Sequence, residues 1–182
     1  MTKKRNKLLY QSEHDELTGL YNKRSLNRYL EDVFEACKLN EKELGILFLD
    51  IDYFKQLNDR YGHGKGDEGI CAVADTLKRI FPEDYVARYG GDEFLVVMPE
   101  RDLTYAMEHA ELLCAGIREC KIPNEDSEVE SWLTISVGGV CAIPKEPNRV
   151  WDFLSAADNT LYEQKKEQKG KVRFYQGEGK YL

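Results

Sequence analysis

Four acidic side chains stand beside two apolar segments of the sequence. Asp50 and Asp52 end an apolar, strand-like run, and Asp92 and Glu93 follow a glycine pair. A carboxylate beside apolar surface is costly unless a cation neutralises it, and magnesium prefers oxygen ligands. The pattern therefore predicts a divalent metal site. The competing interpretations are that one aspartate caps the next helix while the other is solvated, and that Asp92 and Glu93 form an ordinary acidic turn.

A particular pairing of strands would bring these acids together. If the hairpin that carries Asp92 lies beside the strand that carries Asp50, the two carboxylates face one another across neighbouring strands and share metal ions. Two ions about 3.5–4 Å apart would hold the attacking and leaving oxygens of a phosphoryl transfer. The acids therefore favour phosphoryl-transfer chemistry, provided that the fold pairs these strands.

Hydrophobic periodicity and turn residues predict the elements that must position the acids. Gly90-Gly91 predicts a tight turn between two strands. Three glycines within 61–66 are expected to break the helix that begins near residue 53. The other predicted helices are 22–39, 67–80, 103–119 and 148–169, and the predicted strands are 44–52, 85–89, 93–98, 132–142 and 172–175.

The order of these elements contains a central βαββαβ unit, the split βαβ arrangement of ferredoxin-like folds. It predicts an α+β domain with a mainly antiparallel sheet flanked by helices. A chain of 182 residues fits one such domain.

Composition excludes several classes of function. The formal net charge is −7, which argues against a polymeric nucleic acid partner, because duplex binders carry a basic face. Uninterrupted apolar runs have only a few residues, such as 46–49, so we expect no membrane segment and a cytoplasmic protein. The five cysteines lack C-x-x-C spacing, so we expect reduced thiols without structural zinc.

Several segments resemble the GGDEF family, the diguanylate cyclases of bacterial signalling. Gly90-Gly91-Asp92-Glu93-Phe94 is the signature of that family. The other matching segments, in the family's order, are 15–24, 48–59, 61–63, 66–67 and 157–165. The resemblance covers 14–175 and implies one catalytic domain over 15–182, with a fold like that of nucleotide cyclases and polymerase palms. Residues 1–14 are expected to end a linker helix from an absent regulatory module.

The resemblance implies a reaction and its partners. Two GTP molecules condense into cyclic di-GMP and release two pyrophosphates, each 3′-hydroxyl attacking the α-phosphate of the other GTP. Each subunit holds one GTP, so turnover needs a transient homodimer, and the full-length protein is expected to carry an upstream sensor domain. Two Mg²⁺ or Mn²⁺ ions per site are expected. The alternative is a GTP-binding regulatory module without turnover.

The resemblance assigns the metal and catalytic roles. Asp50, Asp92 and the main-chain carbonyl of Ile51 match the metal ligands of the family. Asp92 also stands at the place of the proposed general base. Glu93 is the second signature acid, and Lys55 adds positive charge to the reacting phosphates.

Phosphate binding is expected at two places. Tyr53, Phe54 and Lys55 begin a helix, whose free N–H groups and dipole favour anions, and the family binds phosphates there. The Phe54 side chain is expected to anchor the core. Lys165 matches the phosphate-binding lysine of the family, and Lys169 stands where the family usually has arginine; the two share a helix face.

Base recognition is assigned to Asn58 and Asp67. A carboxylate accepts both N1–H and the 2-amino group of guanine, whereas adenine would leave it unpaired. Asp52 is expected to be structural, holding Lys55 or the turn.

The product-inhibition motif of the family, R-x-x-D, is incomplete. Its positions read Phe81-Pro82-Glu83-Asp84, so the arginine is missing. We expect no tight product inhibition through this segment, and we expect a Phe81→Arg variant to create it.

Overall fold

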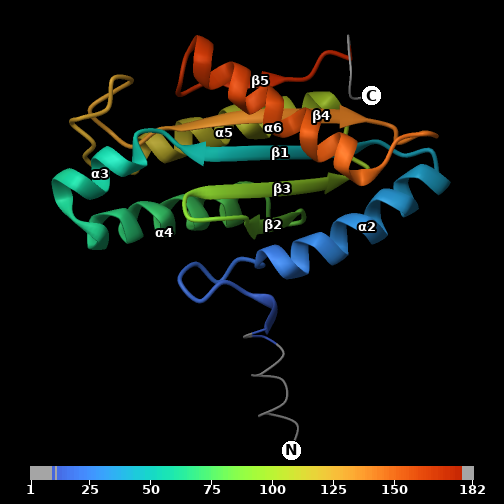
Figure 1. Ribbon diagram of the computed structural model, residues 1–182, viewed down its shortest axis with the longest axis horizontal. Coiled ribbons are helices and arrows are strands. Elements are labelled where there is room, and N and C mark those ends of the chain that lie inside the picture. Colours follow the sequence, from blue (N-terminus) through green and yellow to red (C-terminus); the bar gives the residue numbers. More distant parts are fainter. Residues whose placement is uncertain (1–9, 11, 178–182) are drawn as a thin grey trace, which may run out of the picture.

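Five strands form one sheet in the order β2-β3-β1-β4-β5 (Figure 1). The structure, a computed structural model, describes residue 10 and residues 12–177. All neighbouring strands are antiparallel except β4 and β5, which are parallel. The predicted, mainly antiparallel sheet is thereby confirmed. The strands are β1 (Leu44–Ile51), β2 (Tyr85–Arg88), β3 (Glu93–Pro99), β4 (Ile135–Ala142) and β5 (Val172–Phe174).

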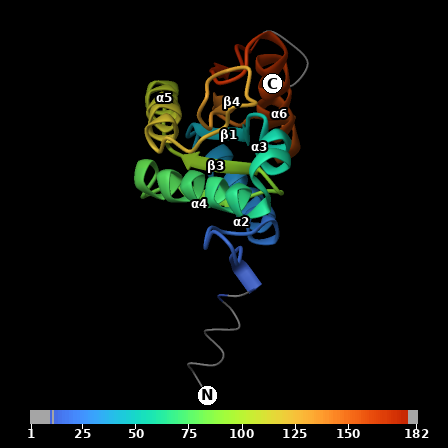
Figure 2. The same cartoon turned by 90° about the vertical axis from the view of Figure 1, so that its left-hand side faces the viewer.

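Helices cover both faces of the sheet, as Figure 2 shows. Alternate residues of β1 point to opposite faces: Leu47 and Leu49 join a core with α4 and α5, whereas Ile46 and Phe48 join a second core with α2 and α6. The result is the α+β architecture that the element order predicts. The helices are α2 (Lys23–Leu39), α3 (Phe54–Tyr61), α4 (His63–Ile80), α5 (Leu103–Glu119) and α6 (Val150–Glu167).

The predicted break in the helix at the glycines is confirmed at Gly62, but α4 begins at His63 rather than at residue 67, so the predicted start of the second helix is wrong. Gly62, with φ of 85°, ends α3 and precedes α4 directly. A Cβ on Gly66 would lie 1.9 Å from Asn58 Oδ1. The glycine lets α3 and α4 pack closely, and this tertiary contact offsets the roughly 1 kcal/mol by which glycine disfavours a helix.

Helix α6 lies directly against β4. A Cβ on Gly138 would stand 2.2 Å from the main-chain nitrogen of Leu161, so only glycine permits this approach. The close contact places the last turns of α6 near the carboxyl end of β1.

The segment before α2 covers the outer edge of β2. The Tyr21 N–H donates to the Val86 carbonyl at 3.2 Å, and the Arg88 N–H donates to the Tyr21 carbonyl at 2.9 Å. Stacked rings continue the contact, with centroids 3.9–4.6 Å apart, in the order Tyr10, His14, Tyr21, Tyr85 and Tyr29.

The predicted linker helix over 1–14 falls mostly on residues outside those described. Within the described part of the chain, no helix combines the length and apolar character needed to cross a bilayer.

Candidate active site

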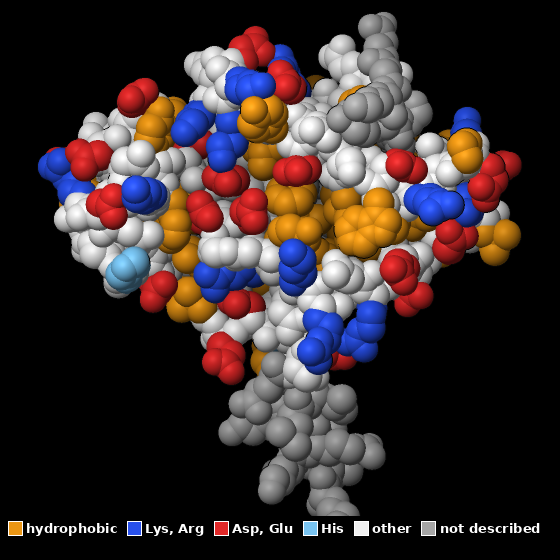
Figure 3. Space-filling model, in the orientation of Figure 1, with side chains coloured by type: hydrophobic (Ala, Val, Ile, Leu, Met, Phe, Trp, Pro, Cys, Tyr) orange, Lys and Arg blue, Asp and Glu red, His pale blue; other side chains and the backbone are white. Residues whose placement is uncertain are grey.

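The adjoining ends of β1 and β3 bring the signature acids together. Asp50 lies opposite Glu93 in the ladder, and the Ile51 N–H donates to the Asp92 carbonyl at 3.2 Å. The predicted placement of the hairpin beside the first strand is confirmed, although the register puts Glu93, not Asp92, directly opposite Asp50. Figure 3 shows acidic side chains gathered over these strand ends, with basic side chains above and below.

Lys165 forms an ion pair with Asp50. Its Nζ lies 3.0 Å from Asp50 Oδ2, and the Asp50 side chain is 15% exposed. Burial raises the pKa of Asp50 to about 6; Lys165 opposes the rise, and the neighbouring charges of Asp92 and Asp52 add to it. The fold therefore creates a site whose negative charge one lysine does not fully balance.

The acidic cluster extends to α6. Burial raises the pKa of Glu93, and the charges of Asp92 and Asp158 raise it further, whereas Lys165 and Lys23 oppose the shift. Burial also raises the pKa of Asp158. Such excess negative charge in a half-buried site favours an additional cation.

The donor chemistry of this site suits a hard divalent cation. Asp50 and Asp92 supply carboxylate oxygens, which magnesium prefers. The Lys165 ammonium already binds Asp50, in the place where a metal ion would bind. Among residue 10 and residues 12–177, no group of three or more His, Cys, Asp or Glu side chains could hold a metal alone. Two carboxylates would thus need other oxygens, such as a main-chain carbonyl, water or phosphate, to complete the coordination.

Asp52 is structural, but its partners differ from those expected. Its side chain is buried and accepts hydrogen bonds from Thr134 Oγ1 at 2.8 Å and Ser136 Oγ at 2.6 Å. The Gly170 N–H in turn donates to Ser136 Oγ at 3.0 Å. Asp52 therefore ties the end of β1 to β4 and to the segment after α6, rather than to Lys55. Only the paired strands reveal this network.

The start of α3 has an unusual backbone. Tyr53, the residue before the helix, has φ of 53° and ψ of 35°, which is the left-handed region. Phe54 is partly buried and packs against the core, as expected, and Lys55 is exposed. The Lys169 Nζ lies 4.0 Å from the centroid of the Tyr53 ring, so the structure brings Lys169 to this turn. Because α6 ends at Glu167, the prediction that Lys165 and Lys169 share a helix face is wrong.

Asn58 and Asp67 come from adjoining parts of α3 and α4. Asn58 Oδ1 is buried and has no hydrogen-bond partner within the described part of the chain, and it lies against Gly66, next to the exposed Asp67. An unsatisfied buried oxygen is costly, which suits a position that pairs with a ligand.

Arg88 is a residue to which the sequence assigned no role. Its guanidinium donates to both carboxylate oxygens of Asp15 at 3.1 and 3.2 Å, and to the carbonyls of Gly90 and Gly91 at 2.7–3.1 Å. It therefore fixes the turn that carries Asp92. Its place two residues before the signature was the available signal.

The incomplete inhibition motif differs from expectation in one respect. Phe81 is 1% exposed and belongs to the core, so Phe81→Arg would bury a charge at a high cost. The expectation that this variant creates a product site is therefore wrong. Asp84 accepts a hydrogen bond from Tyr105 at 2.7 Å, and Arg101 Nε lies 3.7 Å from it.

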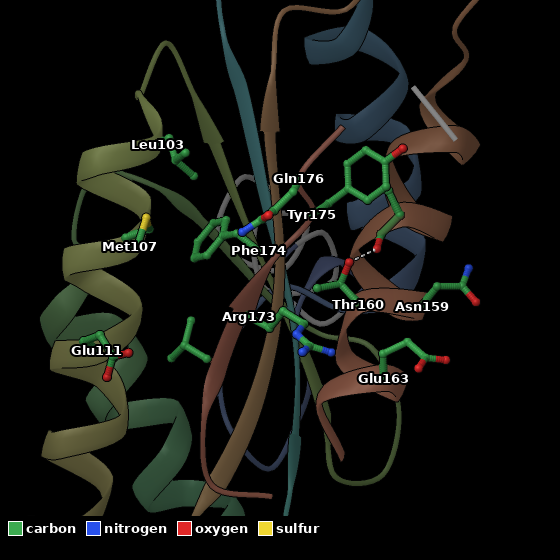
Figure 4. A pocket seen from close by; sticks show the side chains of 12 residues that line it. Leu103, Met107, Glu111, Asn159, Thr160, Glu163, Arg173, Phe174, Tyr175 and Gln176 are labelled. Atoms are coloured by element: carbon green, nitrogen blue, oxygen red, sulfur yellow. Dashed lines mark hydrogen bonds between the residues drawn. The ribbon is translucent and has the colours of Figure 1, made fainter. Parts of the chain in front are cut away.

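A groove of about 1000 Å³ lies elsewhere, between α5 and α6 along β5 (Figure 4). Phe174 and Met107 contribute to its apolar lining. None of the acids or lysines assigned above lines this groove. A search for the active site by cavity volume alone would therefore select the wrong place.

The chain belongs to the GGDEF family. Residues 12–171 match the family model described as "Diguanylate cyclase, GGDEF domain", which confirms the family that the motifs predict.

Curated relatives and solved structures support the same family. The chain is 32% identical over 163 residues to the probable diguanylate cyclase DgcC of Escherichia coli, with 89% of this chain and 43% of the relative covered. It is 35% identical over 153 residues to the diguanylate cyclase VdcA of Vibrio cholerae, with 83% and 43% covered. The chain thus spans less than half the length of these relatives.

The GGDEF domain of DgcB from Caulobacter crescentus, solved in complex with c-di-GMP, superposes with a TM-score of 0.81 at 26% identity, covering 90% of this chain and 95% of that one.

Proposed function

We propose that this domain condenses two GTP molecules into cyclic di-GMP. The observation that carries the proposal is the convergence of Asp50, Asp92 and Glu93 beside Lys165 in a GGDEF domain. In each half-reaction a 3′-oxygen bonds to the α-phosphorus of the other GTP, the bond to the β-phosphate oxygen breaks, and pyrophosphate leaves. The hydroxyl proton passes to a carboxylate, which we assign to Asp92, with Glu93 as its neighbour.

The remaining residues bind and orient the nucleotide. Asn58 and Asp67 recognise guanine, and the main-chain N–H groups of Tyr53 and Phe54 donate hydrogen bonds to phosphate oxygens. Positive charge for the triphosphate comes from Lys55, Lys165 and Lys169.

Asp50, Asp92 and the Ile51 carbonyl would hold two Mg²⁺ or Mn²⁺ ions, which offset the triphosphate charge and acidify the attacking hydroxyl. When cations and nucleotide arrive, Lys165 is free to move from Asp50 to a phosphate.

The proposal requires two copies of the domain, because each copy holds one GTP. The 3′-hydroxyl that attacks the α-phosphate of one GTP belongs to the GTP held by the other copy. It places the domain in the cytoplasm, where GTP is available, with its input supplied by a sensor region outside this chain.

One observation favours a second candidate, a GTP-binding module without turnover. The chain is 32% identical to 21% of the length of the cyclic di-GMP phosphodiesterase NbdA of Pseudomonas aeruginosa, so a similar domain occurs in a protein named for another activity. Incubation with GTP and magnesium, followed by mass spectrometry, separates the candidates. Cyclic di-GMP and pyrophosphate in a 1:2 ratio support turnover, and unchanged GTP contradicts it.

A further inference from the structure

The side chain of Tyr53 stands between two charged groups from distant parts of the chain. Its hydroxyl donates to Glu128 Oε2 at 3.1 Å, and the Lys169 ammonium lies over its ring, 4.0 Å from the centroid. Neither contact belongs to the phosphate-binding role of the Tyr53 main chain. The ring therefore joins three segments: the start of α3, the loop after α5 and the segment after α6.

The loop that carries Glu128 is held at both ends. Arg60 of α3 pairs with Glu125 and Asp126, and the Arg118 Nε donates to Glu130 at 2.6 Å. Glu128 thus presents its carboxylate to Tyr53 from a tethered loop. The hydrogen bond anchors the hydroxyl end of the side chain, so the ring is held in place beside Lys169.

An ammonium over an aromatic face is attracted by the ring quadrupole. Lysine otherwise has a flexible stem and considerable rotamer freedom. The Tyr53 ring removes part of that freedom before any ligand binds, and it holds the charge over the side chain of the residue that precedes α3.

We propose that the Tyr53 side chain is a positioning residue that holds Lys169 ready for the triphosphate of GTP. The inference rests on the proposed function. It also accounts for a lysine where an arginine is usual, because the ring supplies the orientation that a planar guanidinium fork has by itself.

The test measures binding of 3′-deoxyGTP with magnesium by calorimetry, because this nucleotide lacks the attacking hydroxyl. Tyr53→Leu keeps the backbone penalty of a non-glycine residue but removes the ring, and it is expected to weaken binding about two- to fivefold. Lys169→Met is expected to weaken binding about tenfold. The double variant is expected to match Lys169→Met alone, because the ring acts through the lysine.

Two further variants sharpen the result. Tyr53→Phe restores the ring without the hydroxyl and is expected to recover most of the affinity that Tyr53→Leu loses. Lys166→Met is the matched control, since Lys166 lies 4.1 Å from the ring centroid of Tyr162 on the same region of α6, and it is expected to leave binding unchanged.

Additive losses in the double variant, or equal losses in Tyr53→Leu and Tyr53→Phe, would overturn the positioning role while leaving the proposed function intact. No binding of 3′-deoxyGTP by the wild-type domain would overturn both.

Discussion

Replacing Arg88 by methionine should loosen the signature turn and destabilise the domain. The side chains of Arg88 and Asp15 are only 16% and 23% exposed, and the same guanidinium holds the carbonyls of Gly90 and Gly91. A hydrogen bond to a charged group contributes about 1.5–3 kcal/mol. We count one such contribution for the contact of Arg88 with Asp15 and one for its contacts with the glycine carbonyls. Each is taken at the low end because the pair is partly solvated, so the expected loss in the free energy of unfolding is ~3 kcal/mol.

The assay is urea unfolding at pH 7, with circular dichroism as the readout. For a domain of this size, a loss of ~3 kcal/mol corresponds to a fall in Tm of about 6–12 °C. Arg28→Met is the control, because Arg28 is 65% exposed and its nitrogen lies 3.7 Å from Glu13; such a pair contributes about 0–1 kcal/mol.

The loss should also depend on pH. Burial alone would raise the pKa of Asp15, but hydrogen bonds from Thr18 and Arg88 lower it overall. A lowered folded-state pKa stabilises the domain fully above the unfolded value of about 4, and this stabilisation is lost as the pH falls through the folded value. The difference between wild type and Arg88→Met should therefore shrink below about pH 4.

A loss under ~1 kcal/mol, or one that is the same at pH 7 and pH 3, would refute the assignment of this ion pair as the support of the turn. Turnover gives an independent readout. A displacement of about 1 Å at a reacting group can cost up to roughly 100-fold in rate, so we expect kcat to fall at least about tenfold.

Three further predictions concern the proposed reaction. Asp50→Asn or Asp92→Asn should abolish cyclic di-GMP formation while leaving the free energy of unfolding unchanged or higher, because like charges are no longer crowded; more than a few percent of turnover in both variants contradicts the assignment. Asp67→Ser should reduce discrimination against ATP in competition assays, and a wild-type domain that uses ATP as readily as GTP would exclude this role. Specific activity should rise with protein concentration, and a flat profile from nanomolar to high micromolar protein would argue against assembly from separate copies.

The sequence predicts the elements well where periodicity is strong. The range of α5 agrees with its prediction at both ends, and the hairpin of β2 and β3 follows from the Gly90-Gly91 turn between them. It fails where tertiary contacts outweigh local preference. The glycines predict a break that extends to residue 67, whereas the break is Gly62 alone. The contact of Gly66 with Asn58 makes glycine necessary inside α4.

The candidate site shows the same division. The acids could be found from their types and spacing, because charge beside an apolar strand is unusual in any fold. Their supports could not. Thr134 and Ser136 reach Asp52 only after β4 pairs with β1, and Glu128 meets Tyr53 across 75 positions of sequence. Long-range contacts of single polar atoms leave no periodic signal.

The position of Tyr21 on β2 has a consequence for how the domain behaves in concentrated solution. Exposed strand edges recruit further strands and lead to aggregation. Tyr21 occupies the Val86 carbonyl and the Arg88 N–H, which closes the β2 side of the sheet to strand addition. At the opposite side stands β5, which is three residues long and too short to template an extended ladder. A truncation that removes Tyr21 would therefore expose the outer edge of β2 to pairing with other chains. The domain would then aggregate before it unfolds.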